Sequence, residues 1–146
     1  MKNKFGFILV KPQLGENIGA CARSMKNFGF SKLYIVEPKI AFPNHKAKAT
    51  SVGAYDIINK AKVFKKIEDA IDPFNLVISL SARQRDINKK HISLNEFQDI
   101  IKKKNLNVGL MFGPEASGLS NKDLSLSNYI LQIPTSTKFK SLNLSH

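Results

Sequence analysis

The chain has 146 residues, 42% of them hydrophobic and 23% charged, which fits a single globular domain able to bury its own core. Lysine and arginine number 23 against 11 aspartates and glutamates, and the net charge of +12 predicts an anionic partner, above all nucleic acid, or else a solubilising surface. The single cysteine, Cys21, excludes an internal disulfide, and with only three histidines we expect no metal site.

The N-terminal sequence carries no pattern typical of export or membrane insertion. Its apolar run, residues 5–10, is followed by Lys-Pro and is too short for a signal peptide or a membrane span. We therefore expect a cytoplasmic protein. Cys21 lies on a predicted helix face among small residues, so we expect it in the core rather than as a nucleophile.

The N-terminal part of the sequence predicts two buried strands on either side of a helix. Continuous apolar runs at residues 5–10 and 32–36 predict the strands. Between them, Asn17 is suited to cap a helix and Gly29 to end it. The apolar face of this helix would consist of Ile18, Ala22, Met25 and Phe28. A looser helix is expected over residues 46–60.

The rest of the chain alternates short apolar runs with helical patterns. Strands are predicted at residues 63–64, 76–80, 107–112 and 129–133, and helices at residues 67–71, 94–104 and 121–125. Ser93 would cap the 94–104 helix, with inward-facing Leu94, Phe97, Ile100 and Ile101. This alternation predicts an α/β domain with a mostly parallel sheet and helices on both faces. In such sheets, ligands bind beyond the carboxyl ends of the strands.

Two polar stretches that follow predicted strands carry positive charge. Residues 15–23 offer backbone N–H groups and Arg23 to an anion, although the same pattern fits an ordinary capped helix with a solvated arginine. The spacing of Gly15 and Gly19 does not match the dinucleotide fingerprint G-x-G-x-x-G. Residues 81–86 carry Arg83 and Arg85, which could hold an anion or lie in a solvated loop.

Residues 112–120, with the sequence FGPEASGLS, have the glycine spacing of a P-loop. Leu119 stands where a P-loop needs lysine, so this stretch is not expected to bind a triphosphate. Residues 134–145 form a polar loop that leads into a helix-start signal at Ser141. No Ser-His-Asp set, carboxylate pair or metal-ligand spacing occurs. These patterns alone indicate a basic α/β domain that binds a nucleotide-like ligand and RNA.

Three of these stretches together resemble a known family. They read N-x-G-x-x-x-R at residues 17–23, F-G-x-E-x-x-G-L at residues 112–119 and S-L-N-L-S at residues 141–145. In this order and separation, they resemble the SpoU/TrmH class of SPOUT RNA 2′-O-ribose methyltransferases. The opening I-L-V-x-P-Q, the S-A-R-x-R at residues 81–85 and the I-P-T before S-L-N-L are similar to its TrmJ-like branch, which methylates tRNA at position 32 of the anticodon loop.

The resemblance covers essentially the whole chain and implies an α/β trefoil-knot fold, a homodimer and S-adenosylmethionine as cofactor. The residues that it implies for cofactor binding are Leu80, Ser81, Ala82, Gly113, Glu115, Ile133, Lys140, Ser141 and Leu142. The catalytic residues that it implies, around the transferring methyl group and the target ribose, are Asn17, Arg23, Arg85, Ser141 and Asn143. Gly113 and Gly118 would let the backbone approach the adenosine.

Chemistry limits the roles that these residues can take. A guanidinium stays protonated, so we expect Arg23 to bind the adjacent phosphate and stabilise the developing alkoxide rather than act as a base. Ser141 and Asn143 would position the ribose hydroxyl. We expect Glu115 to accept backbone N–H bonds that shape its loop rather than to serve as a base.

The resemblance also implies a last helix that begins at residues 141–145, whereas the sequence ends at His146. We therefore expect one SPOUT domain over residues 1–146 that lacks the final knot helix. A non-catalytic RNA-binding protein of the same fold and a ribosomal RNA 2′-O-methyltransferase are the alternatives. In each case the basic residues that would follow the phosphates are Lys39, Lys46, Lys48, Lys60, Lys62, Lys65, Lys66, Arg83, Arg85, Lys89 and Lys90.

Overall fold

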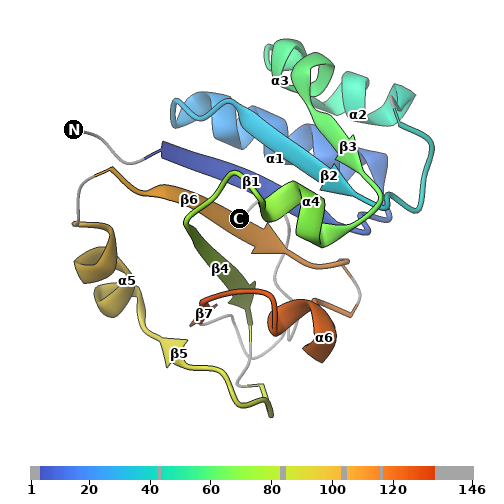
Figure 1. Ribbon diagram of the computed structural model, residues 1–146. Coiled ribbons are helices and arrows are strands. Elements are labelled where there is room, and N and C mark those ends of the chain that lie inside the picture. The colour runs from blue at the N-terminus through green and yellow to red at the C-terminus, as the bar shows by residue number, and fades with distance from the viewer. Residues whose placement is uncertain (1–3, 43, 83–84, 103–104, 116, 134–146) are drawn as a thin grey trace.

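The computed structural model describes residues 4–42, 44–82, 85–102, 105–115 and 117–133. Within these residues, seven strands form one sheet in the order β3-β2-β1-β6-β4-β7-β5, and every neighbouring pair is parallel (Figure 1). The strands are β1 Lys4–Val10, β2 Lys32–Val36, β3 Lys62–Phe64, β4 Leu76–Ser81, β5 His91–Ile92, β6 Asn107–Phe112 and β7 Tyr129–Gln132. The helices are α1 Gly15–Asn27, α2 His45–Thr50, α3 Tyr55–Lys60, α4 Ile67–Ile71, α5 Leu94–Ile101 and α6 Asn121–Leu124.

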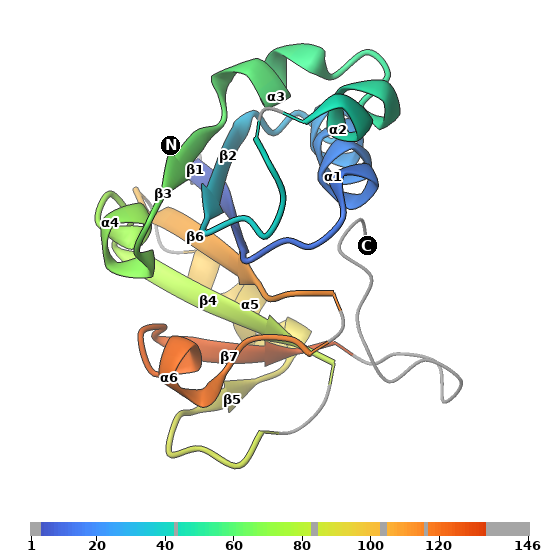
Figure 2. The same ribbon diagram turned by 90° about the vertical axis from the view of Figure 1, so that its right-hand side faces the viewer.

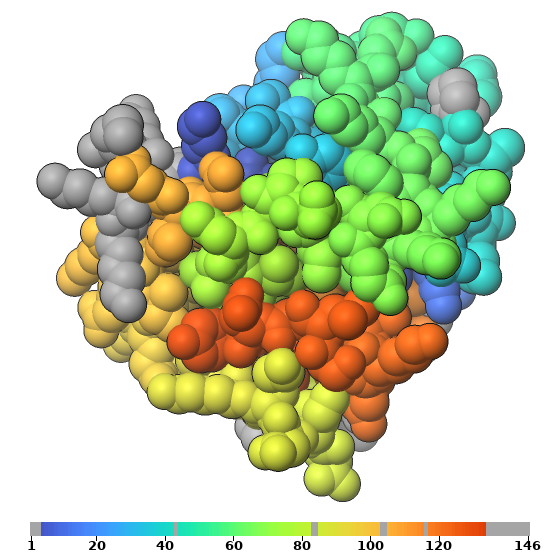
Figure 3. Space-filling view, in the orientation of Figure 1, coloured from blue at the N-terminus to red at the C-terminus, as the bar shows by residue number. Residues whose placement is uncertain are grey.

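Helices cover both faces of the sheet. α1, α2 and α3 pack on one face together with α5, whereas α4 and α6 pack on the other (Figure 2). Figure 3 looks onto the second face, where the light-green α4 region lies above the orange-red region of α6 and β7. The expected parallel sheet with helices on both faces is confirmed. No described helix has both the length and the hydropathy needed to span a lipid bilayer.

The nearly unbroken apolar runs of the strands follow from this burial on two sides. Along β1, Phe7 and Leu9 pack in the cluster under α1, whereas Ile8 and Val10 pack in the cluster under α4. Successive side chains point to opposite faces, so a strand covered twice has no polar side. The six strands predicted from such runs are confirmed to within one residue. The prediction missed β5, because two residues carry no periodicity.

The single helix expected over residues 46–60 is wrong, because the structure forms α2 and α3 there. Gly53 lies between them with a φ of +79°, a left-handed conformation that interrupts the helix. Asn44 begins α2, since its Oδ1 accepts hydrogen bonds from the backbone N–H groups of Lys46 at 2.9 Å and Ala47 at 3.2 Å. This asparagine is an N-cap that the sequence analysis overlooked.

Two expected caps are confirmed, and two expected core residues are not. Ser93 Oγ accepts from Glu96 N at 3.1 Å, and Glu96 Oε1 accepts from Ser93 N at 3.1 Å, so α5 begins with a capping box. Gly29, with a φ of +81°, follows the end of α1. Leu94 and Phe28 are exposed instead of buried; Leu94 is the first residue of α5 and Phe28 the C-cap residue of α1.

Candidate active site

The predicted site segments follow four neighbouring strands of the sheet. In the strand order, β6 lies between β1 and β4, and β7 lies beyond β4. The register pairs Leu9 of β1 with Phe112 of β6, and Ser79 of β4 with Met111 of β6. The segments after these strands therefore begin at one edge of the sheet, where parallel α/β folds bind ligands.

Glu115, in the segment after β6, binds the segment that begins α1. Its Oε2 accepts hydrogen bonds from Leu14 N at 3.0 Å and from Asn17 Nδ2 at 3.2 Å. Its Oε1 accepts from Gln13 N at 3.1 Å. The expected acceptor role of Glu115 is thus confirmed, although the backbone that it binds belongs to the β1–α1 turn rather than to its own loop.

The predicted capping role of Asn17 is wrong. α1 begins two residues earlier, at Gly15, and its N-cap residue Leu14 has no side-chain cap bond. Glu115, about a hundred positions along the chain, binds the backbone just before the helix, and its carboxylate lies where the helix dipole favours an anion. The N–H groups of Gln13 and Leu14, just before the helix, are therefore bonded within the chain.

The two glycines of the 112–120 stretch serve the loop itself. A Cβ added to Gly113 would collide with the backbone of Gly118 and Leu119, so the loop closes directly onto Gly113. Gly118 has a φ of +71°, and its N–H bonds to Pro114 O at 2.8 Å. Gly113 thus lets the loop close on itself beside Glu115, whereas the expected approach of these glycines to an adenosine stays a prediction.

Arg85 holds the other end of the same loop. Its Nη2 donates to Leu119 O at 2.6 Å, and its backbone N donates to His91 Nε2 at 3.1 Å. Asn121 Oδ1 lies 3.5 Å from Nη2. Arg85 therefore fastens the β4–β5 segment to the loop after β6, a contact that no sequence pattern indicated. Arg83 lies outside the described residues.

Among the described residues, Arg23 takes no part in the contacts of Glu115 and Arg85. It is exposed on α1, six residues after Asn17, which corresponds to about 9 Å along the helix axis and about 120° around it. Within the described part of the chain, Arg23 forms no ion pair. Phosphate binding by Arg23 stays a prediction.

The described segments that would hold S-adenosylmethionine come from three adjacent strands. Leu80 and Ser81 end β4 and Ala82 follows it, Gly113 follows β6, and Ile133 follows β7 and donates its N–H to Ser81 O at 2.9 Å. Leu80 and Ile133 are half-buried and extend the apolar clusters to this edge. Apolar side chains beside polar backbone fit an adenosine. The other predicted residues, Lys140, Ser141, Leu142 and Asn143, lie outside the described residues.

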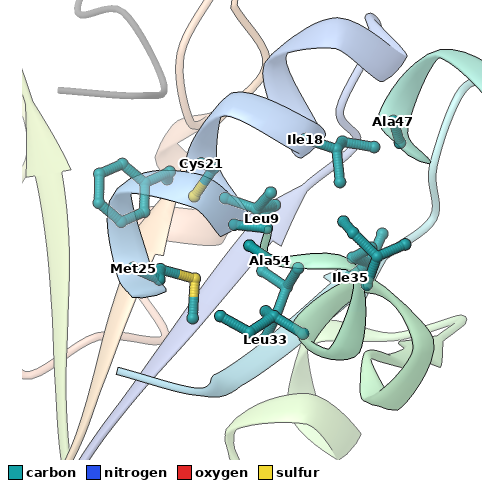
Figure 4. Packing of buried hydrophobic residues seen from close by; sticks show 12 residues of the cluster. Leu9, Ile18, Cys21, Met25, Leu33, Ile35, Ala47 and Ala54 are labelled. Atoms are coloured by element: carbon teal, nitrogen blue, oxygen red, sulfur yellow. The ribbon is translucent and has the colours of Figure 1, made fainter. Parts of the chain in front are cut away.

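Cys21 belongs to the core, as expected. It is buried among Leu9, Ile18, Met25 and their neighbours under α1 (Figure 4). This burial raises the pKa of the thiol to about 12, so Cys21 is not a reactive nucleophile. No three side chains of the metal-binding types gather within the described ranges.

A basic surface covers α2, α3 and β3. We define it by the seven lysines between residues 39 and 66, all of them exposed: Lys39, Lys46, Lys48, Lys60, Lys62, Lys65 and Lys66. Asp56 is the one acid in this range, and Lys26 Nζ binds it at 3.0 Å and lowers the pKa of its carboxyl. Lys48 Nζ lies 5.3 Å from the centre of the exposed Tyr55 ring. Farther along the chain, Lys90 is exposed and Lys89 is half-buried.

Comparison with known proteins gives consistent results. Residues 4–146 match the model of the SpoU rRNA Methylase family. The tRNA (cytidine-2′-O-)-methyltransferase TrmJ of Methanocaldococcus jannaschii is 38% identical over 95% of this chain and 61% of its own length. The tRNA (cytidine/uridine-2′-O-)-methyltransferase TrmJ of Photorhabdus laumondii is 34% identical over 99% of this chain and 60% of its own length. The chain thus spans less than two thirds of these relatives.

Solved structures show the same fold. The crystal structure of TrmJ from Z. mobilis has a TM-score of 0.90 and 36% identity, covering 96% of this chain and 62% of that chain. The SpoU methyltransferase AviRb from Streptomyces viridochromogenes, in complex with AdoMet, has a TM-score of 0.75 at 18% identity, covering 99% of this chain and 56% of that chain. At this lower identity the likeness concerns the fold alone.

Proposed function

The chain belongs to the SpoU rRNA methylase family, and from this we propose that it catalyses the S-adenosylmethionine-dependent 2′-O-methylation of a ribose in tRNA. The relatives that are named tRNA methyltransferases support tRNA as the substrate. We take position 32 of the anticodon loop as the target. The observation that carries the proposal is the hydrogen bond that Asn17 Nδ2 donates to Glu115 Oε2, because it joins two family motifs beside the strand ends where ligands bind.

When bound, S-adenosylmethionine supplies a methyl group on a positively charged sulfur, which a hydroxyl oxygen can attack. The strand-end segments at Leu80–Ala82, Gly113 and Ile133 would hold it, together with Lys140, Ser141 and Leu142. Their contribution is to place the methyl group in line with the incoming oxygen, and such positioning can supply much of a rate enhancement. Glu115 would support this edge from behind, since its oxygens are bonded to residues 13–17.

The ribose hydroxyl oxygen would form the new O–C bond while the bond between that carbon and sulfur breaks, the sulfur keeping the electron pair as a neutral thioether, and the hydroxyl proton would go to solvent. Arg23 would bind the neighbouring phosphate and stabilise negative charge on the oxygen, since its guanidinium can only donate. Ser141 and Asn143 would position the hydroxyl. Arg85 would act by securing the loop after β6, because its Nη2 is bonded to Leu119 O.

The basic surface supports RNA as the partner independently of the cofactor. The surface carries seven exposed lysines, and its one acid, Asp56, is already paired with Lys26. Such a surface would strengthen binding to a phosphate backbone, and this contribution weakens as the salt concentration rises. The same surface keeps a non-catalytic RNA-binding protein as the second candidate function. We further propose a single domain over residues 1–146, a homodimer whose sites are completed across the interface, and a cytoplasmic location, where tRNA is found.

The test is a titration of the chain with S-adenosylmethionine by calorimetry, followed by incubation with unmodified tRNA and nucleoside mass spectrometry. We expect cofactor binding and one 2′-O-methylated nucleoside at position 32. RNA binding without cofactor binding would favour the non-catalytic function instead. Methylation of ribosomal RNA but not tRNA would retain the chemistry and overturn the substrate. Sedimentation of the same sample tests the dimer.

A further inference from the structure

Among the described residues, the carboxylate of Glu115 accepts from three donors, and these come from the segment that leads into α1. They are Gln13 N, Leu14 N and Asn17 Nδ2, at 3.1, 3.0 and 3.2 Å. An ionised carboxylate accepts hydrogen bonds and donates none. Asn17 can therefore turn only its NH₂ group toward Glu115. The orientation of the Asn17 amide follows from this chemistry, and its Oδ1 is not used in the contact.

Asn17 Oδ1 is an acceptor at the edge where the target ribose would lie. The side chain is half-buried, and no described residue donates a hydrogen bond to this oxygen. Arg23 and Arg85, the other described candidates for catalysis, can only donate. A ribose hydroxyl that attacks a methyl group needs an acceptor for its hydrogen, and neither arginine can provide one.

We propose that Glu115 is a positioning residue, which holds the Asn17 amide so that Oδ1 accepts the hydrogen bond of the ribose 2′-hydroxyl. The inference rests on the proposed function and deepens it. An amide oxygen is too weakly basic to take the proton, so Asn17 orients the hydroxyl lone pair toward the methyl group and the proton leaves to solvent. Glu115 acts through Asn17 and does not touch the substrate.

Glu115 is well anchored for this task. Its oxygens accept from two backbone N–H groups just before α1, those of Gln13 and Leu14, which cannot rotate away as side chains can. On its own side, the loop closes onto Gly113, and Arg85 fastens its far end at Leu119. Asn17 is thus held by a carboxylate that is fixed from both directions, and such support is what a precise site requires.

The experiment is a double-mutant cycle with Glu115→Ala and Asn17→Ala, measured as kcat and as KM for S-adenosylmethionine. Each single variant should lower kcat by roughly ten- to a hundredfold, the cost of a misplaced reacting group, with little change in KM. If Glu115 acts through Asn17, the double variant should be no slower than Asn17→Ala. Glu115→Gln keeps one oxygen for Asn17 and should recover part of the rate. Glu16→Gln is the matched control, an exposed acid one residue from Asn17.

A second measurement does not depend on methyl transfer. Exchange of the Asn17 side-chain NH₂ protons, followed by NMR, should be slow in the wild type and faster in Glu115→Ala. Equal exchange in both would overturn the inference. The inference would also be overturned if adding Glu115→Ala to Asn17→Ala lowered kcat by the same factor as Glu115→Ala does in the wild type. A wild-type chain with slow exchange but no methyl transfer to any RNA would reject the proposed function, and the hydroxyl contact with it, while the Glu115–Asn17 contact stands.

Discussion

Gly19, the glycine of the N-x-G-x-x-x-R motif, should be required for helix packing rather than for catalysis. A Cβ built at Gly19 would collide with Thr50 Oγ1 and with the backbone oxygen of Ala47, and would lie 2.9 Å from Ser51 N. Gly15, one turn earlier, meets Asn44 of the same α2 segment. The two glycines therefore let α1 approach α2 closely, and Gly19→Ala would push the helices apart.

The expected cost can be built from its parts. Forcing one extra methyl group into a packed contact costs about 1–3 kcal/mol. Loss of the bond from Thr50 Oγ1 to Glu16 O, now 3.1 Å, adds about 1 kcal/mol. Alanine favours the helix over glycine by about 1 kcal/mol, which offsets part of this. Gly19→Ala should therefore lower the free energy of unfolding by about 1–3 kcal/mol, close to the packing cost itself.

Urea unfolding of Gly19→Ala, Gly29→Ala and Gly19→Ala/Thr50→Ala tests this reasoning. Gly29 has a φ of +81° and open space around its added Cβ, so its variant reports backbone strain alone, about 1 kcal/mol. Removing Thr50 Oγ1 should rescue Gly19→Ala only in part, because the Ala47 oxygen belongs to the backbone. A Gly19→Ala variant as stable as the wild type, or a complete rescue, would refute the packing explanation.

Three further predictions follow from the same contacts. Gly113→Ala should open the loop after β6 and lower the thermal midpoint more than Gly29→Ala does, since its collision is with backbone. Cys21 should react with a thiol reagent only after denaturation. Burial raises the pKa of the Cys21 thiol from 9.0 to about 12, so the stability that the neutral thiol contributes is complete below pH 9 and is lost as the pH rises toward 12. Cys21→Ala should therefore reduce the loss of unfolding free energy over this pH range, measured by urea titration. Replacing Lys60, Lys62, Lys65 and Lys66 with glutamine should weaken tRNA binding, measured by filter binding, and should reduce the dependence of the affinity on salt. Lys102→Gln, at an exposed lysine outside the basic surface, should change neither the affinity nor its salt dependence.

Most of the fold was predictable because its signals are local. Apolar runs of four to six residues located the long strands, since a strand covered on both faces has no polar positions. The capping box at Ser93 and Glu96 was readable because both partners lie within one turn. β5 was not predictable, because its two residues form a strand only through their pairing with β7.

Asn17 shows why the site was harder to predict than the fold. Its residue type and position fit an N-cap, but that rule compares only neighbouring residues. In the structure α1 begins before Asn17, and the Asn17 side chain instead donates to the carboxylate of Glu115, from a distant part of the sequence. Likewise, nothing near Arg85 in the sequence indicates that its partner is the oxygen of Leu119. Such pairs depend on the strand order, which local patterns do not contain.

The strand order itself explains why the loop after β6 is the centre of the site. β6 is flanked by β1 on one side and by β4 on the other, so the segment that follows it can reach the segments after both neighbours. Glu115 binds the β1 side and Leu119 receives Arg85 from the β4 side. Loss of the Glu115 contact or of the Arg85 contact therefore affects a loop that both contacts hold. The contacts of Glu115 and Arg85 thus meet on one loop, and we expect the effects of Glu115 and Arg85 variants on kcat to be non-additive.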